Sequence, residues 1–260
     1  MLLTLNIFIL AILQGLTEFI PVSSSGHLAM GQAWLGLEFP GITVEIVLHV
    51  GTLISILVFY RRRIAVLTAE CVTGRGEGRR YAAWILLASV PAALLYAVAG
   101  SSIEALFGKP DRVGLLLMAN GALLLSMAWL RAPERPLRWP LALAIGVAQA
   151  CALLPGISRS GMTIAMARRL GVTPRRAAEF SLLMSVPAVA GAALLDAVHL
   201  VRNPPESLLA ATPALFLGLL VSAAVGWLAI VCIVRVLSAG RFWMFGIYCL
   251  AVGALAWRTL

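Results

Sequence analysis

Long apolar runs alternate along the chain with short polar segments that are rich in arginine. Runs nearly free of charged residues recur near 2–17, 42–60, 81–103, 113–130, 139–158, 180–195, 207–234 and 242–257. Most reach the roughly 18–20 residues that a helix needs to cross the hydrocarbon core of a bilayer. Helices are the expected spanning form, because lipid offers no partner to backbone N–H and C=O groups. The pattern therefore predicts an all-α polytopic membrane protein.

The composition supports a single membrane domain over residues 1–260. Of the 260 residues, 61% are hydrophobic and 12% are charged, whereas a soluble domain carries about a quarter charged residues. The first apolar run lacks a basic segment and a cleavage site, so it predicts a membrane segment and not a signal peptide. The net charge of +9 comes mainly from arginines that orient the protein. We expect membrane lipids as partners and no nucleic acid.

The arginines predict the path of the chain through the membrane. Fifteen of the 20 Lys and Arg residues lie in 61–80, 131–138 and 168–176 and at Arg235 and Arg241. Cytoplasmic loops collect such residues, so all these segments are expected inside. Residues 139–158 then begin and end on the inside, which requires the chain to turn back near Pro155. By the same reasoning residues 2–20 enter from the outside and turn back at Pro21.

The two predicted re-entrant hairpins have similar sequences. QGLTEFIPVSSSG at 14–26 and QACALLPGISRSG at 149–161 begin with Gln and end with Ser-x-Ser-Gly, at an offset of 135 residues. Each half, 1–133 and 134–260, then holds one re-entrant helix hairpin plus three transmembrane helices, which gives six spans. The halves begin on opposite sides of the membrane. This predicts an inverted-topology repeat, which places a binding site at the midplane between broken helices.

Both hairpins turn into a helix whose start is rich in serine. SSSGHLAMGQAW and SRSGMTIAMARR have the pattern of serine-capped helix starts. The repeat predicts that these starts point toward each other inside the protein. Free N–H groups and the positive end of the helix dipole make such a start an anion site. Two starts facing one cavity suit a doubly charged group such as a pyrophosphate.

Four residues of the two motifs are candidates for chemistry. Glu18 is a carboxylate at membrane depth, which indicates function by default. His27 follows Ser24 by three residues, so the two share a helix face, and the imidazole could activate the hydroxyl or protonate a leaving group. Arg159 is the basic residue expected at membrane depth, and its guanidinium fits phosphate oxygens. A purely structural ion pair between Arg159 and Glu18 is the alternative.

Further polar residues have two interpretations each. Ser158, Ser160 and Thr163 are either phosphate ligands or helix caps. Glu45 and His49 lie four residues apart on one helix, so they either reach the cavity or remain solvated near the end of a span.

The motifs QGLTEFIPVSSSGHL and PGISRSGMT resemble the two signature motifs of bacterial undecaprenyl-diphosphate phosphatase, the bacitracin-resistance protein family. The resemblance covers essentially the whole chain. It implies hydrolysis of undecaprenyl diphosphate to undecaprenyl phosphate and inorganic phosphate, which recycles the lipid carrier of peptidoglycan synthesis and so serves cell wall biogenesis, cell shape and antibiotic resistance. It also implies a multi-pass protein of the bacterial inner membrane whose active site opens toward the periplasm.

The resemblance places the family's functional residues on Glu18, Ser23, Ser24, Ser25, His27, Ser158 and Arg159. Together with the helix-start argument, it gives Ser24, His27, Glu18 and Arg159 as expected catalytic residues. The expected substrate-binding residues are Ser23, Ser25, Gly26, Ser158, Ser160, Gly161, Thr163 and Gln14. A divalent cation, Mg²⁺ or Ca²⁺, is implied, with Glu18 and Gln14 as expected ligands. The first motif position is often Glu in the family, and Gln14 can coordinate only through its carbonyl oxygen.

The expected reaction is attack of Ser24 on the terminal phosphorus of a polyprenyl diphosphate, with His27 as the base. Attack by His27 itself or by water is left open. Arg159, the helix N–H groups and the cation would neutralise the developing charge. A secondary transporter or flippase for an anionic or phospholipid-like substrate shares the predicted architecture and is the alternative function. The sequence also leaves open whether the protein is a monomer or a homodimer.

Overall fold

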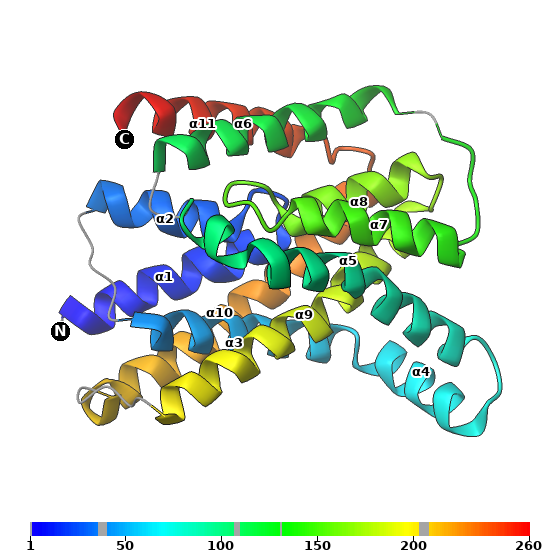
Figure 1. The fold of residues 1–260 in the computed structure, drawn as a ribbon, viewed down its shortest axis with the longest axis horizontal. Helices are drawn as coiled ribbons and strands as arrows, with labels where there is room; N and C mark the ends of the chain where they lie inside the picture. Colours follow the sequence, from blue (N-terminus) through cyan, green and yellow to red (C-terminus); the bar gives the residue numbers. More distant parts are fainter. Residues whose placement is uncertain (1, 36–40, 107–109, 131, 203–207) are drawn as a thin grey trace.

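A computed structural model describes residues 2–35, 41–106, 110–130, 132–202 and 208–260, and all regular elements in these ranges are helices (Figure 1). In chain order they are α1 (Leu2–Phe19), α2 (Ser24–Leu35), α3 (Gly41–Phe59), α4 (Arg61–Thr73), α5 (Gly78–Glu104), α6 (Pro110–Leu125), η1 (Ser126–Trp129), α7 (Trp139–Cys151), α8 (Arg159–Arg169), α9 (Pro174–Arg202), α10 (Leu208–Ser238) and α11 (Met244–Thr259). The predicted all-α class is confirmed.

Three helical segments in these ranges are long and apolar enough to cross a membrane: Gly78–Ile103, Asp111–Trp129 and Thr212–Ser238. A fourth is added if α3 and α4 form one span, although the two are bent by 74° at the break between them. The protein is therefore a multi-pass membrane protein with three or four spans by this criterion. The six spans expected from the sequence stay a prediction.

The outer surface of the bundle is apolar, as a lipid environment requires. On α5 the side chains of Leu86, Leu94 and Val98 are 62%, 62% and 88% exposed, and on α10 Phe216 is 63% exposed. The interior, in contrast, holds buried polar side chains, most of them near the two serine-rich turns: Gln14, Thr17, Glu18, Ser23, His27, Thr52, Ser55, Asn120, Gln149, Ser158, Ser160, Thr163, Ser181, Ser185 and Ser222. Polar groups inside an apolar shell indicate an intramembrane site.

Helices α6 and α11 pack closely along one side of the bundle (Figure 1). Glycines permit this approach: a Cβ atom on Gly121 would lie 2.8 Å from the carbonyl oxygen of Gly246, and one on Gly253 would lie 2.6 Å from that of Gly114. Small residues at helix contacts are the usual means of tight packing in membranes. The pair brings Asn120 and Tyr248 to the site described below.

The α1–α2 and α7–α8 hairpins have their open ends at opposite ends of the bundle, and their turns meet in its middle (Figure 1). The backbone N–H of Gly156 donates to the Ser23 hydroxyl at 3.2 Å. A Cβ atom on Gly26 would lie 3.1 Å from the Cα of Gly156, so the turns touch backbone to backbone. The predicted contact between the two serine-rich turns is confirmed.

The arginine-rich segment 61–80 contains a helix that the hydrophobic pattern does not predict. Helix α4 begins at Arg61 directly after the break at Tyr60, and none of its residues is buried. Arg63 Nε lies 2.8 Å from Glu179 Oε1, which joins α4 to the start of α9. Helix α4, residues 132–138 before α7 and the α8–α9 turn lie at the same end of the bundle, on the right in Figure 1.

Candidate active site

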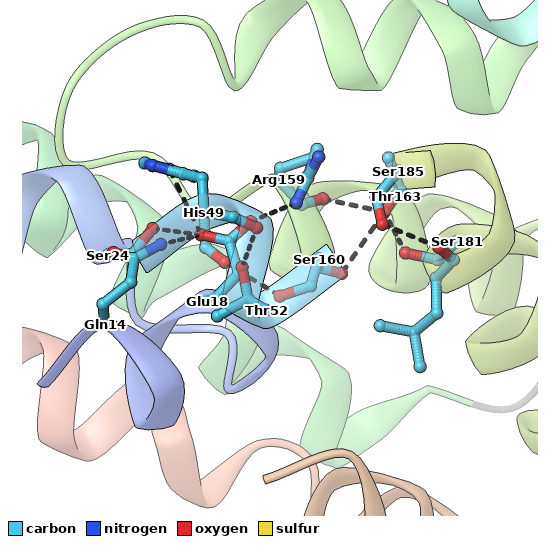
Figure 2. A network of polar contacts seen from close by, with 12 residues as sticks. Gln14, Glu18, Ser24, His49, Thr52, Arg159, Ser160, Thr163, Ser181 and Ser185 are labelled. Carbon is cyan, nitrogen blue, oxygen red and sulfur yellow. Dashed lines mark hydrogen bonds and ion pairs between the residues drawn. The ribbon is translucent and has the colours of Figure 1, made fainter. Parts of the chain in front are cut away.

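The carboxylate of Glu18 is the centre of a polar network formed by both hairpins (Figure 2). Its Oε2 atom accepts hydrogen bonds from Gln14 Nε2 at 3.0 Å and from the Ser24 hydroxyl at 2.8 Å. Its Oε1 atom accepts from the guanidinium of Arg159, which comes from the second motif. Glu18 is 8% exposed. Three donors, one of them charged, stabilise the ionised carboxylate in this buried position.

The turn before α2 holds a strained residue. Helix α1 ends at Phe19 because Pro21 cannot continue it. Ser23 has φ 67°, the only positive φ of a non-glycine residue in the described ranges, which costs roughly 1–3 kcal/mol. Its hydroxyl accepts from the N–H groups of Gly26 at 3.3 Å and Gly156 at 3.2 Å. These contacts hold Ser24 at the first position of α2, beside Glu18.

The turn before α8 places Arg159 in the equivalent position. Ser158 is the N-cap, and its hydroxyl accepts from the N–H of Gly161 at 3.1 Å. Gly156 has φ +95°, and a Cβ atom there would lie 2.5 Å from the carbonyl oxygen of Val113. Only glycine satisfies both constraints. Because α8 begins at Arg159, the guanidinium projects from the helix start to Glu18 on the other hairpin.

Asn120, on α6, holds the two turns together. It is fully buried. Its Nδ2 donates to the carbonyl oxygen of Pro21 at 3.0 Å, and its Oδ1 accepts from the N–H of Ser158 at 3.1 Å. Sequence reasoning missed this residue. The available signal was a lone amide in the apolar run 113–130, since such side chains bind polar partners on neighbouring helices.

His27 does not contact Ser24 as the helical spacing predicts. A carbonyl oxygen only accepts, so Nδ1–H of His27 donates to Ser23 O at 2.9 Å. Nε2 of the neutral ring then accepts from the Tyr248 hydroxyl at 2.9 Å, and the two rings are stacked with centroids 5.6 Å apart. Ser24 donates to Glu18 instead. The imidazole is turned toward Tyr248 on α11, and its hydrogen bond to the carbonyl oxygen of Ser23 supports the strained backbone of that residue.

A pocket of about 300 Å³ opens beside Glu18. It is lined by Thr17, Glu18, Ser23, Ser24, Ser25, Glu45, Ile46, His49, Ala92, Gln149, Ala152, Leu153, Ile157, Ser158, Arg159, Ala188, Val189 and Ala193. Both hairpins thus contribute, and α3, α5 and α9 complete the wall. One part of the lining is polar and ionisable, and another part is aliphatic. A ligand with a charged head and an apolar tail fits this division.

Glu45 and His49 line the pocket, which answers the question that their spacing left open. His49 Nδ1–H donates to the carbonyl oxygen of Glu45 at 2.8 Å. This bond orients the ring so that Nε2 lies 3.9 Å from Glu18 Oε2 (Figure 2).

The predicted substrate-binding residues divide into two groups. Ser23, Ser25 and Ser158 line the pocket, as does the predicted nucleophile Ser24, and the other predicted substrate-binding residues are not part of its lining. Thr163 is fully buried and bonds the Arg159 carbonyl at 2.7 Å and the Ser181 hydroxyl at 2.6 Å (Figure 2). Ser160 lies 3.2 Å from the Ser158 hydroxyl. Gly26 and Gly161 let the turns approach: a Cβ atom on Gly161 would lie 3.2 Å from Asn120 Oδ1.

No three His, Cys, Asp or Glu side chains converge on one point in the described ranges, so the chain alone forms no complete metal site there. Mg²⁺, however, is commonly held by one or two carboxylates together with substrate phosphates. Glu18 and Glu45 line one pocket and fit this donor set. Gln14 directs its nitrogen to Glu18, and its Oε1 atom is buried and has no hydrogen-bond partner within the described part of the chain.

Comparison with known proteins shows which family this chain resembles. The family model of bacitracin resistance protein BacA matches residues 7–255. The undecaprenyl-diphosphatase of Salinibacter ruber is 38% identical, over 95% of this chain and 96% of its own length. Those of Geobacter sulfurreducens and Korarchaeum cryptofilum are 40% and 36% identical, over 94% of this chain and 94% and 95% of their own lengths.

Proposed function

The chain belongs to the bacitracin resistance protein BacA family and acts as an undecaprenyl-diphosphatase, and we propose that the pocket beside Glu18 is where it does so. The substrate is a lipid diphosphate, and the products are the lipid monophosphate and inorganic phosphate. The observation that carries the proposal is the meeting of Ser24, Glu18 and Arg159, from two distant motifs, at one pocket. This function replaces the transporter alternative.

We propose that Ser24 is the nucleophile and Glu18 its base. The Ser24 hydroxyl already donates to Glu18 Oε2 at 2.8 Å, within reach for proton transfer. Oγ bonds to the terminal phosphorus, the bond from that phosphorus to the bridging oxygen breaks, and the hydroxyl proton moves to Glu18. Water then attacks the phosphoserine, and Glu18 returns its proton to the departing Oγ. His27, expected as the base from its spacing, has the role of holding the backbone of Ser23.

Arg159 binds the terminal phosphate in this proposal. Its side chain is 22% exposed at the pocket, so it can exchange part of its contact with Glu18 for phosphate oxygens. The starts of α2 and α8 support it, because the first N–H groups of a helix have no intrahelical acceptor and favour anions. Developing negative charge on the phosphoryl oxygens is neutralised mainly by such fixed donors.

A divalent cation, Mg²⁺ or Ca²⁺, is part of the proposal because the fixed charges that line the pocket do not offset a diphosphate. They comprise two carboxylates, Glu18 and Glu45, and one guanidinium, Arg159. Glu18 and Glu45 would hold the cation, and Gln14 could add its carbonyl oxygen only if its amide turned around. When bound, the cation supplies positive charge to the phosphate oxygens.

The inverted repeat of residues 1–133 and 134–260 with six spans is also a proposal. Several contacts support it: α1 packs on α10, and the corresponding α7 packs on α5. The serine contacts match as well, since Ser23 and Ser158 each cap the N–H three residues later. The arginine-rich end of the bundle would lie in the cytoplasm, with the pocket open to the periplasm of a bacterial inner membrane.

The test is phosphate release by purified protein in detergent, given a polyprenyl diphosphate and Mg²⁺. Release by the wild type and its loss in Glu18→Gln support the proposal. Tyr248→Phe is the control for the arrangement around His27, because it removes a contact outside the pocket and is expected to lower the rate by about tenfold at most, far less than Glu18→Gln. Wild-type rates in Glu18→Gln would contradict the role of Glu18.

A further inference from the structure

Gln149, on α7, is among the residues that line the pocket, and neither polar atom of its side chain has a hydrogen-bond partner among the described residues. Nε2 and Oε1 are both buried and form no hydrogen bond in the part of the chain that the structure describes. The residue is 3% exposed and lines the same pocket as Ser24 and Arg159. An unsatisfied buried polar group costs roughly 1–3 kcal/mol. Such a group in a native structure calls for an explanation, for example a catalytic role or a bound ion or water that completes its hydrogen bonds.

The first motif shows what the missing partner is. Gln14 holds the same place in its motif as Gln149, and its Nε2 donates to Glu18, four residues later, at 3.0 Å. The offset of 135 residues places Leu153 where the first motif has Glu18. Leu153 also lines the pocket, and it offers no acceptor. Gln149 therefore lacks the anionic oxygen that its counterpart binds, and an anion in the pocket would supply it.

The neighbours of Gln149 in the chain indicate which phosphate of the lipid diphosphate its amide binds. The next turn of the chain contributes the apolar residues Ala152 and Leu153, and Ser158 and Arg159 follow. If Arg159 and Ser24 hold the terminal phosphate, the lipid end of the substrate extends toward the apolar part of the lining. The phosphate joined to the lipid then lies between the two, and Gln149, which precedes the apolar Ala152 and Leu153 in the chain by three and four residues, is the amide that we assign to it.

We propose that Gln149 Nε2–H donates a hydrogen bond to the proximal phosphate of the lipid diphosphate, the leaving group of the reaction. This inference rests on the proposed function of the same pocket. When the bond between the terminal phosphorus and the bridging oxygen breaks, negative charge moves onto the proximal phosphate. A fixed donor there stabilises the transition state and also the bound lipid monophosphate.

The experiment compares wild type with Gln149→Leu for phosphate release and for product inhibition. A hydrogen bond to a charged group contributes roughly 1.5–3 kcal/mol, so kcat/KM is expected to fall about 10- to 100-fold. Inhibition by farnesyl monophosphate should weaken by a similar factor, and inhibition by inorganic phosphate, which takes the terminal site, should not change. The Tm in detergent should stay constant or rise, because no hydrogen bond within the protein is lost.

Gln14→Leu makes the same change in the other hairpin but removes a donor to Glu18, so it should lower kcat, whereas weaker inhibition by farnesyl monophosphate is expected only in Gln149→Leu. Gln149→Glu should lower kcat/KM more than Gln149→Leu, since it sets a carboxylate against the phosphate. An unchanged farnesyl monophosphate constant in Gln149→Leu, with or without a lower Tm, would overturn the inference and assign the amide to packing or to a buried water. An inactive wild type would instead overturn the proposed function.

Discussion

Replacing Arg159 by alanine distinguishes a phosphate-binding guanidinium from a structural ion pair. In the structure Arg159 contacts Glu18, and their side chains are 22% and 6% exposed. If the guanidinium stabilises the transferring phosphoryl group, its loss removes a preorganised donor from a site with little water. Such a loss costs about 3–4 kcal/mol, or 10²- to 10³-fold in kcat/KM. The assay is phosphate release from a polyprenyl diphosphate in detergent micelles.

The double variant Arg159→Ala/Glu18→Gln makes this test decisive. Arg159→Ala alone leaves the buried Glu18 carboxylate without its guanidinium partner. Breaking a buried ion pair costs roughly 3–5 kcal/mol of folding free energy. The cost is lower here because Gln14 and Ser24 still donate to Glu18. The Tm should therefore fall and then recover in the double variant, which has no unpaired charge. Activity should not recover with it. A double variant within about tenfold of wild-type kcat/KM would refute the reasoning, because the two residues would then only stabilise each other.

Four further changes test other parts of the account. Asn120→Leu leaves the Pro21 carbonyl and the Ser158 N–H without their partner, so thermal denaturation should show a lower Tm, by the equivalent of roughly 2–4 kcal/mol, and phosphate release should fall. Gly156→Ala meets a positive φ and a backbone oxygen 2.5 Å from the new Cβ, and little folded protein should elute in size-exclusion chromatography. Tyr248→Phe keeps the stacking on His27 but loses one hydrogen bond, and a fall in kcat of about tenfold or less is expected. EDTA should abolish phosphate release until Mg²⁺ is restored. Glu45→Gln should raise the Mg²⁺ concentration that restores half of the activity. The same half-restoring Mg²⁺ concentration in wild type and Glu45→Gln would exclude Glu45 as a ligand.

The sequence was sufficient for the features that depend on local rules. The apolar runs predict the long helices, because the hydrophobic pattern of a helix depends only on residues that are close in the sequence. The serines before α2 and α8 were recognised as caps, and the contacts of Ser23 and Ser158 with the N–H three residues later agree. The arginine topology requires both hairpins to turn back near Pro21 and Pro155, and this requirement predicts that the two motifs meet inside the protein.

The contacts of individual side chains in the site depend on residues far away in the sequence. The direction of the His27 side chain is set by the carbonyl oxygen of Ser23 and by Tyr248 on the last helix, and helical spacing does not reveal these contacts. Asn120 forms hydrogen bonds with Pro21 and Ser158, which lie in the turns of two different hairpins. The sequence shows Gln149 only as the first residue of a motif, because a missing hydrogen-bond partner is visible only once the surrounding residues are known.

The central claim is that the Ser24 hydroxyl, activated by Glu18 on one hairpin and opposed by Arg159 on the other, breaks the phosphoanhydride bond. The most direct measurement is the rate of phosphate release by purified Ser24→Ala, with Mg²⁺ and a polyprenyl diphosphate at saturation. The account predicts a loss of about 10³-fold or more, with substrate binding and Tm close to wild type. Release by Ser24→Ala within about tenfold of the wild-type rate would contradict it, because water would then attack without the serine.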